Sequence, residues 1–333
     1  MRNTRNRWMR GARAVAAVAC ATLVAAGCGG GDIGEETTAN EEQADAAGGE
    51  CGELNMAVNP WVGYEASAYV VGTVAQEELG CTVNYKDLKE DVSWQGFGTG
   101  EVDVVIEDWG HPDLEKKFVA EKGGDGSATD FGENGNVGII GWYVPGWLAE
   151  EHPDILNYEN LNKYASEFAT SESGGQGQFL GSDPSYVQFD EAIVNNLDLD
   201  FKVVFSGGEA ATLTAYEQAQ ENQEFLIGYF WEPQYIHAEI PLEKVELPPY
   251  EEGCQDDPAE VACDYPETPL KKFVSTEWAE SDSTSVDLVQ NFEWTNDDQN
   301  LVAKYITADK MSPEDAAAKW VEENPDKVEA WLG

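Results

Sequence analysis

Four short segments of the sequence place tryptophan or tyrosine next to proline or glycine. They are Asn-Pro-Trp-Val-Gly-Tyr at 59–64, Asp-Trp-Gly-His-Pro at 108–112, Gly-Trp-Tyr-Val-Pro at 141–145 and Tyr-Phe-Trp-Glu-Pro at 229–233. An aromatic face attracts a cation, and a quaternary ammonium group, which has no N–H to donate, is held well in few other ways. A single tryptophan among the 11 is more often a core residue. Four segments at the ends of strand-like runs instead favour an aromatic cage.

The elements that carry the first two segments alternate between strand and helix. Residues 53–58, 82–88 and 102–107 have the composition of short strands, and residues 64–79 have helical periodicity that ends at Gly80. This pattern predicts a βαβ unit. Ligands of open α/β sheets bind beyond the carboxyl ends of the strands. Trp61 and Trp109 both follow such ends.

The alternation restarts in the middle of the chain. Strand-like runs are at 136–144, 178–181, 202–205 and 224–230, and helical runs are at 158–168 and 209–220. Asp183 and Pro184 suit the N-cap and first position of a further helix. The chain ends with strand-like 243–247 and 271–275, a helix at 298–308 and a last helix capped by Ser312. Crossings near 138–145 and 228–233 predict an α/β protein with lobe 1 at 51–140 and 234–333 and lobe 2 at 141–233.

The N-terminus has the composition of an export signal. Five arginines precede an apolar stretch at 14–26 that is too short to span a bilayer, so residues 1–27 are predicted to be a signal peptide. Ala25-Ala26-Gly27-Cys28 resembles a lipobox, which predicts a lipid on Cys28 and an extracytoplasmic protein anchored to the membrane only there. Ordinary secretion, with Cys28 uninvolved, is the alternative. Residues 28–50 lack aromatic and basic residues and are predicted to be a disordered acidic tether.

The remaining chain is strongly acidic and contains no arginine. All five arginines lie in the signal, which leaves 14 lysines against 64 acids, a formal charge of 14 − 64 = −50. Nucleic acid and anionic lipid are therefore excluded as partners on electrostatic grounds. Receptors for ordinary amino acids usually clamp the α-carboxylate with a bidentate guanidinium, which this chain lacks.

The cysteine count suits an oxidising compartment. Without Cys20 and Cys28, four cysteines remain. Cys51 and Cys81 each precede a strand of the predicted βαβ unit, and Cys254 and Cys263 bracket a polar loop of eight residues. Two local disulfides, Cys51–Cys81 and Cys254–Cys263, are predicted. None of the four has the Cys/His clustering of a zinc site.

Signals for catalysis and for cofactors are weak. The chain has three histidines, no Gly-x-Ser-x-Gly elbow, no glycine-rich phosphate loop and no His-Glu-x-x-His. His111, beside Asp108 and Asp113, is a candidate for catalysis or metal binding, but a loop histidine among acids is usually solvated. We predict a protein that is not an enzyme and needs no cofactor or metal.

A helix start next to Trp61 offers an alternative to arginine. Val62, Gly63 and Tyr64 would form the first turn of the helix that runs to residue 79, and N–H groups at this position have no partner within the helix. Such donors hold a carboxylate together with the helix dipole. A second helix start at Ser185 and Tyr186 could serve from the other lobe. A cage plus backbone donors suits a zwitterion with a fixed cation and a carboxylate.

The combination of motifs resembles a known family. Pro-Trp-Val-Gly-Tyr-Glu-Ala at 60–66, Gly-Glu-Val-Asp-Val at 100–104 with Trp-Gly-His-Pro at 109–112, and Trp-Glu-Pro-Gln-Tyr at 231–235 look like the substrate-binding proteins of ABC transporters for glycine betaine, proline betaine, choline and carnitine. The resemblance covers residues 53–332. It implies a two-lobed, type II periplasmic-binding-protein-like fold that closes on its ligand and delivers it to a permease for osmoprotectant uptake. It also implies box walls at Trp61, Trp109 and Trp231, with Tyr143 or Trp142 as the fourth.

Two positions depart from the family pattern. Choline-specific relatives carry an aspartate two residues after the first tryptophan, where this chain has Gly63, and this favours a carboxylated ligand such as glycine betaine. Relatives often have histidine after Trp-x-Pro, where this chain has Gln234. Choline or carnitine, with Glu65 or Asp108 as the missing acid, is the alternative within the family. A tethered ligand sensor and an enzyme for an anionic ligand are the alternatives outside it.

Overall fold

The computed structural model describes residues 51–333. The signal peptide at 1–27, the tether at 28–50 and the lipidation site Cys28 lie outside these residues. Within them, no helix is long and apolar enough to cross a membrane.

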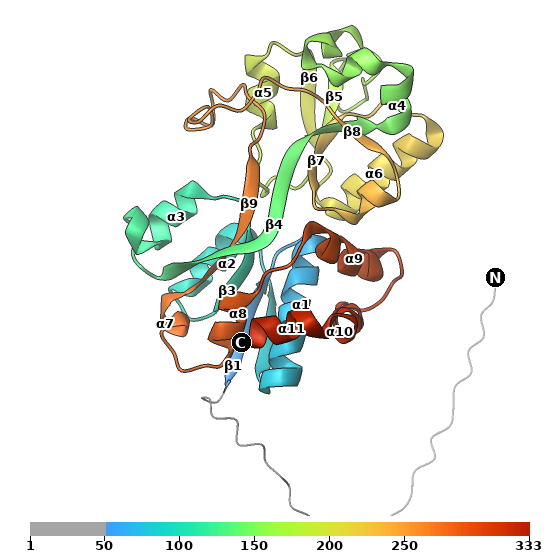
Figure 1. The fold of residues 1–333 in the computed structure, drawn as a ribbon. Coiled ribbons are helices and arrows are strands. Elements are labelled where there is room, and N and C mark those ends of the chain that lie inside the picture. Colours follow the sequence, from blue (N-terminus) through green and yellow to red (C-terminus); the bar gives the residue numbers. More distant parts are fainter. Residues whose placement is uncertain (1–50) are drawn as a thin grey trace, which may run out of the picture. The chain divides into compact units, whose positions relative to one another are not determined.

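Residues 51–333 form one mixed sheet with helices on its faces (Figure 1). The strands are β1 Glu53–Val58, β2 Thr82–Asp87, β3 Val104–Asp108, β4 Ala128–Pro145, β5 Gly177–Gly181, β6 Phe201–Phe205, β7 Gly228–Glu232, β8 Leu242–Lys244 and β9 Glu267–Ser275. The α-helices are α1 Val62–Leu79, α2 Glu90–Phe97, α3 Pro112–Phe118, α4 Gly146–Glu151, α5 Asp190–Asn196, α6 Glu209–Asn222, α7 Thr276–Ala279, α8 Ser285–Asn291, α9 Asn296–Thr307, α10 Pro313–Glu323 and α11 Pro325–Leu332. Short 3₁₀ helices are η1 Ala120–Lys122, η2 Pro153–Leu156, η3 Tyr158–Lys163 and η4 Tyr235–Ala238.

The predicted βαβ unit begins lobe 1. Strand β1 pairs in parallel with β2 and with β3, and α1 connects β1 to β2. Helix α1 ends where Gly80 adopts a φ of 70°, which a residue without a Cβ adopts readily. The register places Glu53 opposite Thr82, so the residues just before the two strands are neighbours. Cys51 and Cys81 form a disulfide there, with their Cα atoms 4.9 Å apart, as predicted.

Two long strands connect the lobes. Strands β4 and β9 are antiparallel to each other and pass from one lobe to the other, as the green and orange ribbons of Figure 1 show. The order β2-β1-β3-β9-β4-β7-β5-β6 makes them the centre of the sheet. The first crossing was predicted near 138–145, within β4. The second crossing is β9, and not the predicted segment at 228–233, which is strand β7.

This second crossing shifts the boundary of lobe 2. Strand β8 pairs with the end of β4, Asn196 of α5 donates to the carbonyls of Ala259 and Val261, and Tyr265 donates to Asp190. Residues 242–266, including the predicted Cys254–Cys263 disulfide, therefore pack on lobe 2, although the sequence assigned them to lobe 1. The local pattern marks a strand at 228–232 but does not show which strand leaves the lobe.

Two predicted local structures differ from the structure. Residues 158–168, predicted to be a helix, form the short 3₁₀ helix η3 followed by turns. No helix begins at Pro184, because Asp183 uses its side chain in a local turn, where it accepts hydrogen bonds from the N–H and the hydroxyl of Ser185. A carboxylate that bonds two residues onward stabilises a turn as well as it caps a helix.

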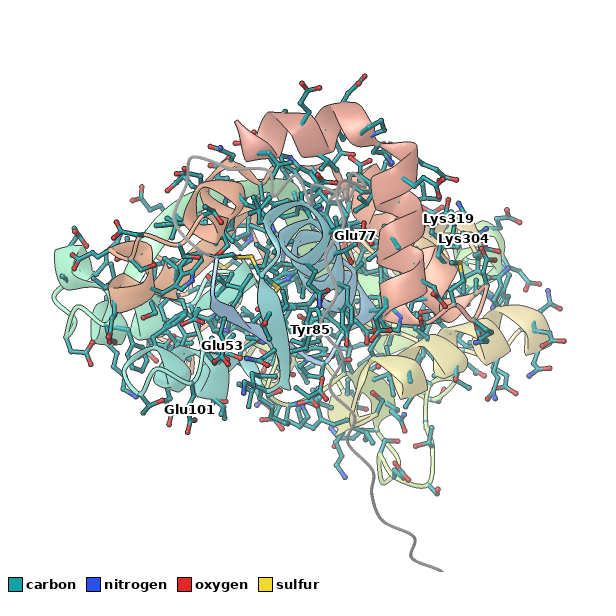
Figure 2. The ribbon with its side chains drawn as sticks, turned by 90° about the horizontal axis from the view of Figure 1, so that it is seen from below. Glu53, Glu77, Tyr85, Glu101, Lys304 and Lys319 are labelled. Atoms are coloured by element: carbon teal, nitrogen blue, oxygen red, sulfur yellow. A yellow bond between two sulfur atoms is a disulfide. The ribbon has the colours of Figure 1, made fainter. Side chains whose placement is uncertain are left out.

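The C-terminal helices complete lobe 1. Helix α1 packs against α9 and α10. Ser312 caps α10 by accepting the N–H of Asp315, as predicted, and Thr295 forms a capping box with Asp298 at α9. Outside this core the surface is acidic, and Figure 2 labels the exposed Glu53, Glu77 and Glu101 in a view of one face.

Candidate ligand-binding site

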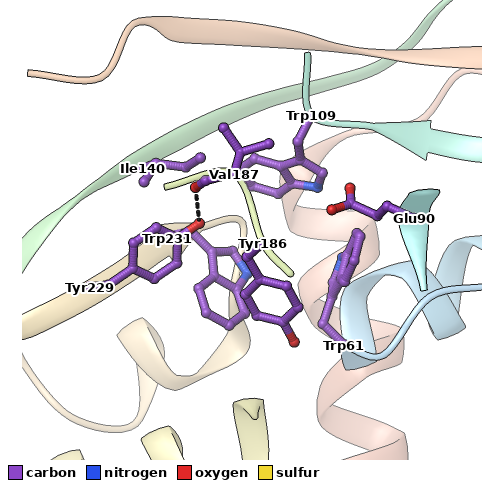
Figure 3. Close-up of a pocket in the computed structure, with 8 residues that line it drawn as sticks. All are labelled: Trp61, Glu90, Trp109, Ile140, Tyr186, Val187, Tyr229 and Trp231. Atoms are coloured by element: carbon purple, nitrogen blue, oxygen red, sulfur yellow. Dashed lines mark hydrogen bonds between the residues drawn. The ribbon is translucent and has the colours of Figure 1, made fainter. Parts of the chain in front are cut away.

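A small cavity lies between the lobes, and aromatic rings form most of its wall (Figure 3). It is lined by five aromatic residues with Glu90, Ile140 and Val187; the aromatic residues are Trp61, Trp109, Tyr186, Tyr229 and Trp231. The narrow space among these rings suits only a small ligand.

Short elements of both lobes position these rings. Trp61 immediately precedes α1, and Trp109 immediately follows β3, so both lie at the carboxyl ends of parallel strands of lobe 1. Tyr229 and Trp231 are two residues apart in β7 of lobe 2 and therefore share one face of the sheet. Tyr186 comes from the turn after β5. We refer to these five rings as the cage.

The rings of the cage stand at steep angles to one another. Tyr186 is nearly perpendicular to Trp61, at 80° with centroids 5.5 Å apart, and to Trp231, at 85° with centroids 5.6 Å apart. Edge-to-face contacts of this kind stabilise aromatic pairs. All five rings line the same cavity, so a cation there would lie among several aromatic rings.

A buried carboxylate orients the two tryptophans of lobe 1. The indole N–H groups of Trp61 and Trp109 donate to the same oxygen, Glu107 Oε1, at 2.9 and 2.8 Å. Glu107 Oε2 accepts from Ser67 Oγ at 3.0 Å and from Gln299 Nε2 at 2.6 Å. Burial raises the pKa of Glu107, and these four hydrogen bonds oppose that shift. Glu107 is 1% exposed, so it fixes the rings from behind without entering the cavity.

Close packing supports Trp109 on its other side. A Cβ at Gly138 of β4 would lie 2.6 Å from the Trp109 ring, so only glycine lets the indole rest on the strand. Gly138 and Glu107 together leave Trp109 little freedom to rotate.

Glu90, at the start of α2, is the acidic residue that lines the cavity. His111 lies between two carboxylates, with Nε2 3.4 Å from Glu90 Oε2 and Nδ1 2.8 Å from Asp108 Oδ1. Burial lowers the pKa of His111, but the charges of Glu90 and Asp108 outweigh it and hold that pKa well above its ordinary value. Burial raises the pKa of Glu90, against the influence of His111. A protonated His111 thus opposes the protonation of Glu90 that burial favours.

The structure brings four of the eight predicted ligand-binding residues together in the cavity, namely Trp61, Trp109, Tyr186 and Trp231. Trp142 and Tyr143 do not line it, which corrects the expectation that one of them forms the fourth wall. Ile140 of β4 faces the cavity, and Trp142 lies one step further along the same face, where its indole N–H donates to Asp190 in lobe 2. Tyr143 points to the opposite face, toward Glu232 and His237.

Val62 and Gly63 do not line the cavity either. Val62 borders a wider cleft on the other side of Trp61, together with Glu65. A Cβ at Gly63 would lie 2.6 Å from Gln299 Nε2, so an aspartate at this position would displace the amide that holds Glu107. Asp108, the other candidate acid, bonds His111 and the N–H of Gly110.

One of the three first-turn N–H groups expected to meet a ligand carboxylate already has a partner. The N–H of Val62 donates to Glu209 Oε2 at 2.8 Å, and Gln234 donates to Glu209 Oε1 at 2.7 Å. Glu209 is the first residue of α6 in lobe 2. This contact joins the lobes, as do the hydrogen bond from Tyr186 to the carbonyl of Pro60 and the Lys89–Asp183 ion pair.

Sequence reasoning did not identify Tyr229 and Glu90, which line the cavity, or Glu107 and Glu209, which accept hydrogen bonds from Trp61 and Val62. Tyr229 belongs to the aromatic segment at 229–233 and lies two residues before Trp231 in the same strand. Because such residues share one face of a sheet, the sequence could have placed Tyr229 beside Trp231. The three glutamates carry no local signal in a chain with 64 acids. Among residues 51–333 no group of acids, histidines and cysteines is suited to hold a metal ion.

The two lobes, the crossing strands and the aromatic cavity between them define a substrate-binding protein. The family model OpuAC, described as the substrate-binding domain of ABC-type glycine betaine transport systems, matches residues 52–323, and the chain belongs to this family. It is thus a substrate-binding protein of the ABC-type glycine betaine transport family, and not an enzyme.

Individual relatives are distant. The trimethylamine N-oxide-binding protein of Pelagibacter ubique (strain HTCC1062) is 25% identical over 274 residues, which cover 79% of this chain and 85% of that protein. The structure of lactococcal OpuAC in its closed-liganded conformation with glycine betaine has a TM-score of 0.67 and 20% sequence identity to this chain. The match covers 84% of this chain and 99% of the OpuAC chain. An ABC-transporter choline-binding protein in complex with choline has the same TM-score and identity and covers 85% and 92%. The structural likenesses confirm the predicted type II binding-protein fold.

Proposed function

We propose that this protein captures a small ligand with a fully methylated nitrogen and delivers it to an ABC permease for osmoprotectant uptake. The observation that carries the proposal is the cage, in which five aromatic residues and one carboxyl surround a small cavity. Glycine betaine, choline, carnitine and trimethylamine N-oxide all have a methylated nitrogen, and the names of the relatives include all four.

The cage selects for methylation through solvation. A methylated ammonium has no N–H groups to lose from water, whereas an ordinary ammonium must give up strong hydrogen bonds on entry. The indole N–H groups of Trp61 and Trp109 point away from the ligand space to Glu107, so these rings contribute π surface. Each ring is worth about 0.5 to 2 kcal/mol toward a cation.

Titration calorimetry of residues 51–333 tests the proposal. The ligands are glycine betaine, choline, carnitine, proline betaine and trimethylamine N-oxide, each compared with an unmethylated counterpart such as glycine or ethanolamine. At least one methylated compound is expected to bind far more tightly than its counterpart. Equal affinity for glycine and glycine betaine, with no binding of the other methylated compounds, would falsify the proposal that the cage selects a methylated nitrogen.

Variants locate the site. Trp231→Ala removes one wall and should weaken binding by about 2- to 30-fold, which corresponds to 0.5 to 2 kcal/mol. Trp147→Ala is the matched control, because Trp147 is half-buried in lobe 2 against Phe225 and does not line the cavity. Equal losses of affinity in the two variants would contradict the assignment of the site.

The membrane attachment is proposed from the sequence. Members of this family work outside the cytoplasm with a permease, and Cys28 in the lipobox-like segment is the proposed anchor. Membrane fractionation of cells that express the wild type and Cys28→Ser tests it. The serine variant should leave the membrane fraction, and the same distribution of both proteins would refute the anchor.

A further inference from the structure

We propose that Glu209 takes the position of a ligand carboxylate, so that the site selects a methylated ammonium cation that brings no carboxylate, the class to which choline belongs. This inference rests on the proposed function, and it replaces the preference for glycine betaine that the sequence alone suggested. It depends on the contacts of Glu209, on the charges around the cage and on the position of Glu90.

Glu209 already uses two of the donors that a betaine could use. The first-turn N–H of α1 at Val62 donates to Oε2 at 2.8 Å, and the amide of Gln234 donates to Oε1 at 2.7 Å. N–H groups of a first helical turn have no partner within the helix, and the helix dipole stabilises an anion there. Both carboxylate oxygens of Glu209 are therefore satisfied by the groups next to Trp61.

Other donors near the cage are also engaged. The indoles of Trp61 and Trp109 donate to Glu107, and the hydroxyls of Tyr186 and Tyr229 donate to the carbonyls of Pro60 and Val187. A ligand carboxylate would have to displace Glu209 and then remain beside it. Two carboxylates in contact repel each other strongly in a partly dehydrated cleft.

The charges around the site favour a cation. The cleft beyond Trp61 is lined by four acids, Glu65, Asp87, Asp183 and Glu209, and by one lysine, Lys89, which is paired with Asp183. Glu90 lines the aromatic cavity, and His111 next to it forms ion pairs with both Glu90 and Asp108. The positive charge of His111 is therefore divided between two carboxylates. A monocation gains from this excess of negative charge, whereas a zwitterion carries a carboxylate into it.

Glu90 supplies what the sequence appeared to lack. An acid was expected two residues after Trp61 in a choline site, and Gly63 stands there because Gln299 leaves no room for a side chain. Glu90 instead reaches the cavity from α2. A carboxylate at this wall accepts a hydrogen bond from an alcohol, which choline has and glycine betaine lacks.

Calorimetry with choline and glycine betaine on three proteins tests the inference: the wild type, Glu209→Gln and Glu221→Gln. Glu221 is exposed, belongs to the same helix α6 and does not line the cleft. Glu221→Gln therefore removes the same charge as Glu209→Gln at a site away from the cleft. Measurements at pH 8.5 keep Glu209 ionised, because burial, with the charges of Glu65 and Glu107, raises its pKa to about 7. Thermal unfolding of each protein checks that it is folded.

The wild type is expected to bind choline at least about 10-fold more tightly than glycine betaine, and Glu209→Gln should reduce this ratio at least about 5-fold by strengthening betaine binding. Glu221→Gln should leave the ratio unchanged. A wild type that prefers glycine betaine overturns the inference, as does a ratio that Glu209→Gln leaves unaltered. Absence of binding by every methylated compound overturns the proposed function instead.

Discussion

Replacing Glu107 should separate its effect on the cage from its effect on stability. Its carboxylate accepts hydrogen bonds from Trp61, Trp109, Ser67 and Gln299. Glu107→Ala leaves these buried donors without an acceptor. Removal of one partner from a buried charged network costs about 3 to 5 kcal/mol, which is a large part of a typical total stability of about 5 to 15 kcal/mol.

Glu107→Gln should behave differently. Its remaining carbonyl oxygen can still accept both indole N–H groups, while its new NH₂ group meets the NH₂ of Gln299. Gln299 cannot simply rotate, because its own oxygen accepts from Asn136 at 2.8 Å. We therefore expect Glu107→Gln to lose about 1 to 3 kcal/mol of stability, the cost of one unsatisfied buried pair, and to keep both tryptophans in place.

Urea denaturation and calorimetry with the tightest ligand measure the two effects. In Glu107→Ala, Trp61 and Trp109 are free to turn. Losing about half of each cation–π contact, about 0.5 to 2 kcal/mol in total, weakens binding about 2- to 30-fold. In Glu107→Gln, binding should change less than about threefold. If both variants lose the same affinity, or if Glu107→Ala binds as the wild type does, Glu107 does not position the cage.

Two further predictions concern stability. The disulfides join cysteines that are 30 and 9 positions apart. In the chain-entropy description, removing Cys51–Cys81 should therefore cost about 3.6 kcal/mol of stability and removing Cys254–Cys263 about 2.6 kcal/mol. Denaturation of the two double-serine variants measures these losses, and a larger loss for Cys254–Cys263 would contradict the prediction. Burial raises the pKa of Asp190 from 3.8 to about 6, so its contribution to stability is fully present below about pH 4 and is lost as the pH rises through 6, about 3 kcal/mol in all. Asp190→Asn should remove this part of the pH dependence, and an unchanged stability profile from pH 4 to 8 would show that the carboxyl does not titrate there.

The sequence by itself determined the features that depend on near neighbours. Strand and helix periodicity identified β1, α1 and β2, and their parallel pairing followed from the βαβ pattern, so Cys51 and Cys81 had to meet. Residue types and turn positions identified Trp61, Trp109 and Trp231 as candidate cage residues before any contact was known. All three line the cavity.

Only the tertiary structure decided which other side chains join them. Glu107 meets Gln299 across 192 positions, and Glu209 meets Val62 across 147 positions. Nothing in the chain near either glutamate distinguishes it from the other acids. Trp142 stands in an aromatic segment like the other three, yet β4 carries it past the cavity to Asp190. The order of the strands and the path of β4 and β9 set these distances, and both result from packing the whole sheet, since a local pattern specifies which face a residue occupies and not what lies opposite.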